Sequence, residues 1–93
     1  MTVAADFDDT LGRIRGLVIG LATVLSADES REVEELLEHV ELGEAVRTLA
    51  WIVAEEGKQI TNGDFLEIQA LAQRMEIQDE LPASLPDHVI RSR

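Results

Sequence analysis

The chain has 93 residues, enough for one small domain with a single hydrophobic core, and we expect that domain to span residues 1–93. Its 19 acidic and 8 basic residues give a formal net charge of −11, so the chain repels nucleic acids and anionic membranes and attracts basic partners. The absence of cysteine excludes disulfides, thiolate metal ligands and cysteine nucleophiles. The acidic N-terminal residues lack the basic segment of a secretory signal peptide, so we expect a cytoplasmic protein.

Residues 7–25 predict a first helix, and Asp6 before them is an acceptable N-cap. Apolar residues recur there at spacings of three and four: Phe7, Leu11, Ile14, Val18, Leu21 and Leu25. A strand is the alternative over Leu17–Leu25, because a continuous apolar, β-branched stretch also suits a buried strand. The sequence leaves helix or strand open here. Arg13 and Arg15 make the apolar run too short to span a membrane.

Gly12, Gly16 and Gly20 lie four residues apart and therefore on one stripe of this helix. In a helix interior, each destabilises by about 1 kcal/mol relative to alanine. Close packing of another helix against the stripe would offset that loss. The second helix can belong to the same domain or to a second copy of the chain, which would make the glycine stripe a homodimer interface.

A second helix is predicted over residues 27–41, where Ser26 and Glu29 form a capping box and Gly43 is placed to end the helix. Its apolar stripe consists of Val33, Leu36, Leu37 and Val40. The segment 28–44 contains eight acidic residues and one basic residue. Most of the acidic residues lie away from the apolar stripe, as a solvated face or as a binding surface for a basic partner.

Residues 44–56 and 62–76 predict a helical hairpin, the third and fourth helices. Gly57 suits the end of the third helix, while Thr61 and Asp64 form a capping box for the fourth. The apolar faces consist of Val46, Leu49, Ala50 and Val53 in the third helix and Phe65, Ile68, Leu71, Ala72 and Met75 in the fourth. Residues 79–93 contain two prolines and are expected to form a loosely packed segment, either an extended tail or a short final turn docked on the bundle. The fold class is therefore all-α, a small bundle of four helices.

Trp51 lies about 140° around the third helix from its apolar face. Either this helix is central and buried on two sides, or the tryptophan is presented to a partner. Tryptophan is enriched among the residues that contribute most to protein interfaces, so the second possibility bears on function.

No catalytic, cofactor-binding or metal-binding residues are expected, and the chain is not expected to be an enzyme. Residues 6–10 match the DxDxT motif of haloacid-dehalogenase-like phosphohydrolases, in which Asp6 would be the nucleophile and Asp8 the general acid and base. That motif ends a buried strand in its family, whereas only five residues precede it here. A helix N-terminus with aspartates in its first turn explains these residues more simply.

The segment Val33–Met75 resembles the MafI family of bacterial immunity proteins. The resemblance lies in Glu41-Leu42-Gly43-Glu44-Ala45, Leu49-Ala50, Glu55-Glu56, Ile60-Thr61, Ile68, Leu71 and Met75. It implies a small helical protein that accompanies a polymorphic toxin and neutralises that toxin by binding it. The resemblance assigns no binding residues.

We therefore expect an immunity protein whose acidic helical surface binds a basic toxin domain, such as a nuclease. The candidate contact residues are Asp28, Glu32, Glu35, Glu38, Glu41, Glu44 and Trp51. The alternative is a homo-oligomeric structural or adaptor module without catalytic activity, which associates through the glycine stripe of Gly12, Gly16 and Gly20.

Overall fold

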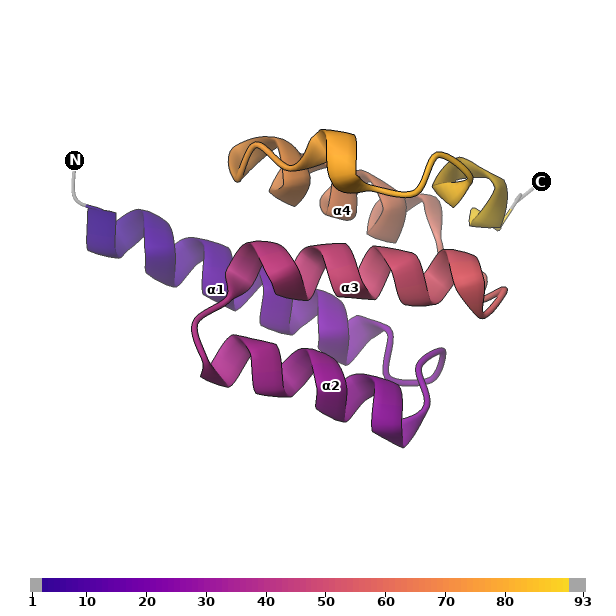
Figure 1. Cartoon of the computed structure of the whole chain (residues 1–93), viewed down its shortest axis with the longest axis horizontal. Helices are drawn as coiled ribbons and strands as arrows, with labels where there is room; N and C mark the ends of the chain where they lie inside the picture. The colour runs from indigo at the N-terminus through magenta and orange to yellow at the C-terminus, as the bar shows by residue number, and fades with distance from the viewer. Residues whose placement is uncertain (1–2, 91–93) are drawn as a thin grey trace.

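The computed structural model describes residues 3–90 and has an all-α architecture (Figure 1). Its elements are α1 (Val3–Gly20), α2 (Ala27–Glu38), α3 (Leu42–Glu55), α4 (Asn62–Arg74) and the short 3₁₀ helices η1 (Gln78–Glu80) and η2 (Leu85–His88). Within the described range there is no strand, only an isolated bridge between Ile60 and Val89. The expected fold class, a small bundle of four helices, is confirmed.

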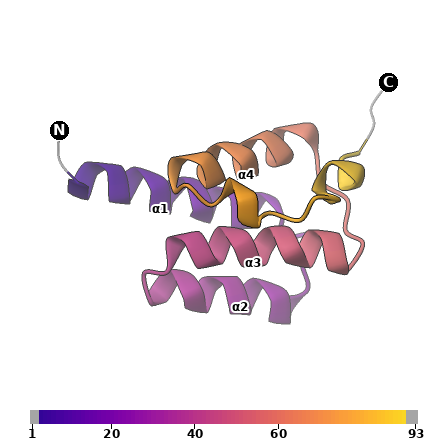
Figure 2. The same ribbon diagram turned by 45° about the horizontal axis from the view of Figure 1, so that its top comes forward.

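Helix α3 occupies the centre of the bundle and contacts α1, α2, α4 and η2. Figure 1 shows it in front of α1, and Figures 1 and 2 both show α2 along one side of it and α4 along the other. Its buried residues are Ala45, Val46, Leu49, Ala50 and Val53. They meet Ile14, Leu21, Val33, Ile68 and Leu71 from the other helices in one core. Helix α3 is therefore central, which is one of the two explanations for the position of Trp51 away from the apolar face.

Helix α1 differs from the prediction at both ends. It begins at Val3 rather than after Asp6, and it ends at Gly20, so residues 21–25 form turns. Leu21 and Leu25 are nevertheless buried, because those turns fold back onto the core. The strand alternative for Leu17–Leu25 is wrong: the segment divides into the end of a helix and a turn.

The corner between α2 and α3 also differs from the prediction. Helix α2 ends at Glu38, short of residue 41, and α3 begins at Leu42, so Gly43 lies in the first turn of α3 and does not end α2. Val40 takes the left-handed conformation instead, with φ +63°. The N–H of Glu41 donates to the Leu36 carbonyl at 2.9 Å, which closes the end of α2. A reversal this short requires a left-handed residue, whatever residue the sequence supplies there.

The hairpin of α3 and α4 follows the prediction closely. Gly57 has φ +65° directly after α3. Thr61 accepts a hydrogen bond from the backbone N–H of Asp64, and the Asp64 carboxylate accepts one from the N–H of Thr61. Both interactions of the predicted capping box are present. Helix α4 ends at Arg74, two residues before the predicted end.

Residues 78–90, called here the C-terminal strap, pack on the bundle. The expected loose packing is wrong for these residues, and the alternative of a short final turn docked on the bundle is present as η2. Both views show the strap running back along α4 and α3 (Figures 1 and 2). Leu85 is 1% exposed, the N–H of Ile60 donates to the His88 carbonyl at 3.0 Å, and the N–H of Ile90 donates to the Ile60 carbonyl at 2.7 Å. Pro82 and Pro86 prevent a fifth long helix, yet the short 3₁₀ helix η2 still carries Leu85 into the core. Residues 91–93 of the expected tail lie outside the described residues.

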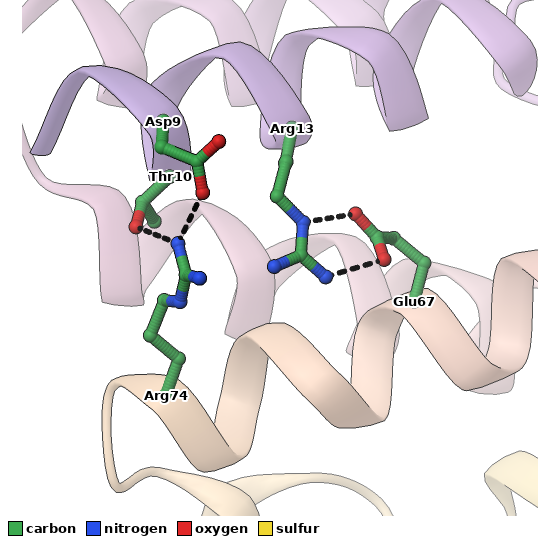
Figure 3. Close-up of polar contacts among 5 residues, drawn as sticks. All are labelled: Asp9, Thr10, Arg13, Glu67 and Arg74. Atoms are coloured by element: carbon green, nitrogen blue, oxygen red, sulfur yellow. Dashed lines mark hydrogen bonds and ion pairs between the residues drawn. The ribbon is translucent and has the colours of Figure 1, made fainter. Parts of the chain in front are cut away.

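Two sets of charged contacts join α1 to α4 (Figure 3). The Arg13 guanidinium donates two hydrogen bonds to the Glu67 carboxylate, at 2.8 and 2.7 Å. Arg74 donates to Asp9 at 2.6 Å and to the buried Thr10 hydroxyl at 3.0 Å. These contacts fix the angle between two helices whose apolar faces both turn toward α3.

The glycine stripe takes no part in packing inside the described molecule. A Cβ atom added at Gly12, Gly16 or Gly20 would meet nothing within 4 Å. The prediction that another helix of the same domain packs against the stripe is therefore wrong, because α1 turns this face to solvent. No helix within residues 3–90 is long and apolar enough to cross a membrane.

Candidate protein-binding groove

An open groove runs between α2 and α3, with a volume of about 530 Å³. It is lined by Glu29, Glu32, Glu44, Arg47, Thr48, Trp51, Ile52, Glu55 and Glu56. A smaller hollow of about 250 Å³ continues it past Glu35 and His39 and shares Glu32, Glu44 and Thr48 with it. We call the two together the acidic groove.

The spacing of residues on the two helices explains why these side chains converge. Glu44, Thr48, Trp51 and Glu55 recur every three or four residues on α3, so they form one stripe beside the buried stripe of that helix. Helix α2 has a similar stripe, formed by Glu29, Glu32 and Leu36. Because α2 and α3 pack side by side, the two stripes become the walls of a single groove.

Two of the carboxylates in the groove are already engaged within the chain. Glu29 accepts a hydrogen bond from the Ser26 N–H at 2.8 Å and lies 3.1 Å from the Lys58 ammonium. The hydrogen bond from Ser26 is the main cause that lowers the pKa of Glu29; burial opposes it and Lys58 adds to it. Glu44 pairs with Arg47, one turn further along α3. Both carboxylates are therefore held in place by partners within the chain.

The remaining carboxylates of the acidic groove have no ion-pair partner among residues 3–90. They are Glu32, Glu35, Glu55 and Glu56. Four uncompensated negative charges along the walls of one groove create a strongly negative local potential. Such a groove can attract and orient a cationic side chain.

Trp51 forms part of the groove wall and is also anchored to the strap. Its indole N–H donates to the Glu80 carbonyl at 2.8 Å, while the residue remains 41% exposed. The hydrogen bond holds the ring in one orientation, so a partner would meet a rigid aromatic surface. Trp51 thus lies on a central helix and is also accessible from solvent.

Four of the seven contact residues expected from the sequence line the acidic groove: Glu32, Glu35, Glu44 and Trp51. The other three do not. Asp28 pairs with Arg31 at 2.8 Å, and Glu38 and Glu41 are exposed near the corner that joins α2 to α3.

Sequence reasoning missed Glu29, Arg47, Thr48, Ile52, Glu55 and Glu56. The regular spacing of Glu44, Thr48, Trp51 and Glu55 is a signal that would have found two of these residues, Thr48 and Glu55. It identifies a second stripe on α3 but not the neighbour that faces it.

The DxDxT segment lies inside α1 and does not follow a strand. Asp6 borders a separate hollow of about 360 Å³ with Arg74 and Met75, while Asp8 is exposed. Residues two apart on a helix point about 160° away from each other, so these two carboxylates do not converge on one metal position.

Among residues 3–90, no three histidine, aspartate or glutamate side chains converge as a metal site. The acidic groove is instead a surface of negative charge and aromatic area between two rigid helices, suited to contact with a protein. In comparisons with known proteins, the chain matches no protein-family model, and no curated protein and no solved structure shows significant similarity to it.

Proposed function

We propose that this protein binds a basic protein through the acidic groove and acts as an immunity protein that neutralises a bacterial toxin. The observation that carries the proposal is the set of unpaired carboxylates, Glu32, Glu55 and Glu56, around the rigid indole of Trp51. Charges on a rigid scaffold speed association and select the sign of the partner's charge, while tryptophan supplies buried contact area.

The resemblance to the MafI family supports the same function from the sequence. A stoichiometric inhibitor needs only a surface complementary to its target. Nuclease toxins carry basic surfaces because they bind nucleic acid, so a groove with this charge suits them as targets. The proposed partner is therefore a toxin with a basic nucleic-acid-binding face, and no nucleic acid takes part in the complex itself.

Co-expression with the toxin encoded by a neighbouring reading frame tests the proposal. Wild-type protein is expected to restore growth and to co-purify with the toxin. The triple variant Glu32→Gln, Glu55→Gln, Glu56→Gln should bind at least about tenfold more weakly, because it removes the unpaired charges of the groove.

The matched control is the triple variant Asp28→Asn, Glu38→Gln, Glu41→Gln, which removes three carboxylates outside the groove. It makes the same change in net charge and should bind nearly as well as wild type. Equal losses in the two triple variants would show that the groove has no special role. Failure to rescue or capture any adjacent toxin would reject the immunity function.

A homo-oligomeric module is the second candidate, favoured by the open space beside Gly16 and by Ile19, which is 72% exposed on the same helix. A second copy of α1 could approach this face closely. Sedimentation at roughly tens of micromolar, the range of a weak self-contact, tests it. Dimers that disappear in Gly16→Leu would support it, and a strict monomer would reject it.

A further inference from the structure

We infer that Arg47 is an internal competitor for the acidic groove. Its guanidinium occupies the position that an arginine of a partner would take. When that arginine binds, the Arg47 guanidinium moves to pair with Glu80 of the strap. The inference rests on the proposed function, because it describes how the same groove admits a cationic side chain. It adds an autoinhibitory contact and gives the strap a role in binding.

Arg47 already forms the kind of contact that the groove would offer to a partner. A single nitrogen of its guanidinium, Nη2, donates to both carboxylate oxygens of Glu44. Arg47 lies on α3 one turn before Trp51, so the charge of the guanidinium stands within the groove. The Arg47 side chain is 39% exposed, and it can change rotamer without opening the core.

Glu80 provides a second position for the same guanidinium. Its Oε1 lies 3.7 Å from Nη1 of Arg47, too far for a hydrogen bond but within the range of an ion pair. The strap is held at this place by the hydrogen bond from Trp51 to the Glu80 carbonyl. Arg47 therefore stands between a close carboxylate in the groove and a more distant one on the strap.

A partner's arginine that enters beside Trp51 would compete with Arg47 for Glu44. Arginine matches a carboxylate through two parallel hydrogen bonds, which lysine cannot form. Two guanidinium groups at one carboxylate repel each other, so the displaced Arg47 needs another counter-charge. Glu80 supplies it after a side-chain rotation, and the exchange favours partners that present an arginine over those that present a lysine.

The experiment measures binding of a hexa-arginine peptide by the full chain, through calorimetry and the fluorescence of Trp51. Trp51 is the single tryptophan of the chain, so its emission reports on the groove directly. Arg47→Gln should bind up to about fivefold more tightly than wild type, the change that corresponds to removing one exposed ion pair of about 1 kcal/mol. Arg31→Gln is the matched control, because it removes the same charge from a pair outside the groove.

Glu80→Gln tests the receiving position. It should weaken binding by about threefold or more in the wild-type chain and have no effect in the Arg47→Gln background, since no displaced arginine then needs a counter-charge. Asp79→Asn, next to it on η1, controls for the loss of one negative charge. Thermal unfolding of each variant verifies that the fold is retained.

The possible outcomes separate the two proposals. Binding by Arg47→Gln that is no tighter than by Arg31→Gln, or an equal effect of Glu80→Gln in both backgrounds, overturns the internal competitor and leaves the groove as a binding site. No binding of hexa-arginine by wild type or by any variant overturns the groove itself. A hexa-lysine peptide bound as tightly as hexa-arginine would reject the preference for arginine.

Discussion

Gly57 and Gly16 show how one residue type can have opposite effects on stability in one chain. Gly57 has φ +65°, a conformation that residues with a Cβ atom rarely adopt. Gly16 lies inside α1 with ordinary helical geometry and open space beside it. The first glycine is required by the backbone, whereas the second only weakens its helix.

Alanine at these two positions should change the free energy of unfolding in opposite directions. Gly57→Ala is expected to lower it by about 1 kcal/mol, because the new Cβ atom is strained in the left-handed conformation. Gly16→Ala should raise it by about 0.5–1 kcal/mol through higher helix propensity. Urea denaturation at low protein concentration measures both, and effects of the same sign would contradict the backbone geometry.

Glu67 gives the fold a dependence on pH. Hydrogen bonds from Arg13 lower the pKa of Glu67 below its ordinary value of 4.5, against the opposing effect of burial. A carboxyl group with a lowered pKa in the folded state stabilises the fold fully above its ordinary pKa. The contribution is lost as the pH falls through the folded-state pKa, because protonation removes the charge that Arg13 binds.

Glu67→Gln should therefore destabilise the protein by about 1 kcal/mol at pH 7, a figure that allows for solvent screening of a partly exposed pair. The difference from wild type should shrink below about pH 4, where wild-type Glu67 also becomes neutral. Denaturation midpoints measured between pH 3 and pH 7 test this. Glu38→Gln, at an exposed carboxylate outside the described ion pairs, is the matched control for the loss of one negative charge.

At the scale of the elements, helix ends are defined by local side chains in some places and by packing in others. Helices α2 and α4 have complete capping boxes, from Ser26 with Glu29 and from Thr61 with Asp64. Helix α3 has none, since its N-cap Glu41 makes no side-chain hydrogen bond to the helix. Because α3 is central, contacts with the neighbouring helices stabilise it in place of a side-chain cap.

Ser26→Ala is expected to lower the free energy of unfolding by about 1 kcal/mol, because the N–H of Glu29 loses its acceptor. Ser84→Ala is the matched control. Ser84 precedes η2 but makes no capping hydrogen bond through its side chain, so its loss should change stability by less than about 0.5 kcal/mol. Equal effects of the two substitutions would show that the cap of α2 adds no stability.

At the scale of the whole molecule, the strap closes the core and supports the acidic groove at the same time. Leu85 enters the core from η2, and Glu80 accepts the hydrogen bond from Trp51. Changes in the strap can therefore affect both stability and binding, through different residues.

Leu85→Ala should lower the free energy of unfolding by about 2–5 kcal/mol, the range for removing a buried leucine side chain. Ile90→Ala is the comparison in the same strap. Ile90 is 46% exposed, and its contact with Ile60 is made by the backbone, so a loss below about 1 kcal/mol is expected. Thermal or urea unfolding measures both, and a small effect of Leu85→Ala would mean that the strap is not part of the folded core.

The sequence by itself determined the second, third and fourth helices, both capping boxes and the left-handed position of Gly57, while it left a strand open for part of the first helix. Each depends on residues within a few positions of one another, whose periodicity or hydrogen bonding is local. It also indicated that negative charge concentrates on α2 and the start of α3, because composition and spacing are properties of the chain alone.

Only the tertiary structure decided which of these charges share a groove, that the glycine stripe faces solvent, and that the strap returns to the core. The tertiary structure also decided the left-handed conformation of Val40 and the hydrogen bond from Trp51 to Glu80. Each depends on how helices distant in the sequence pack together. The physical reason is that the packing of the helices is set by the apolar surface that the whole molecule buries. At the corners and along the outer faces, this requirement outweighs the local preferences of the residues.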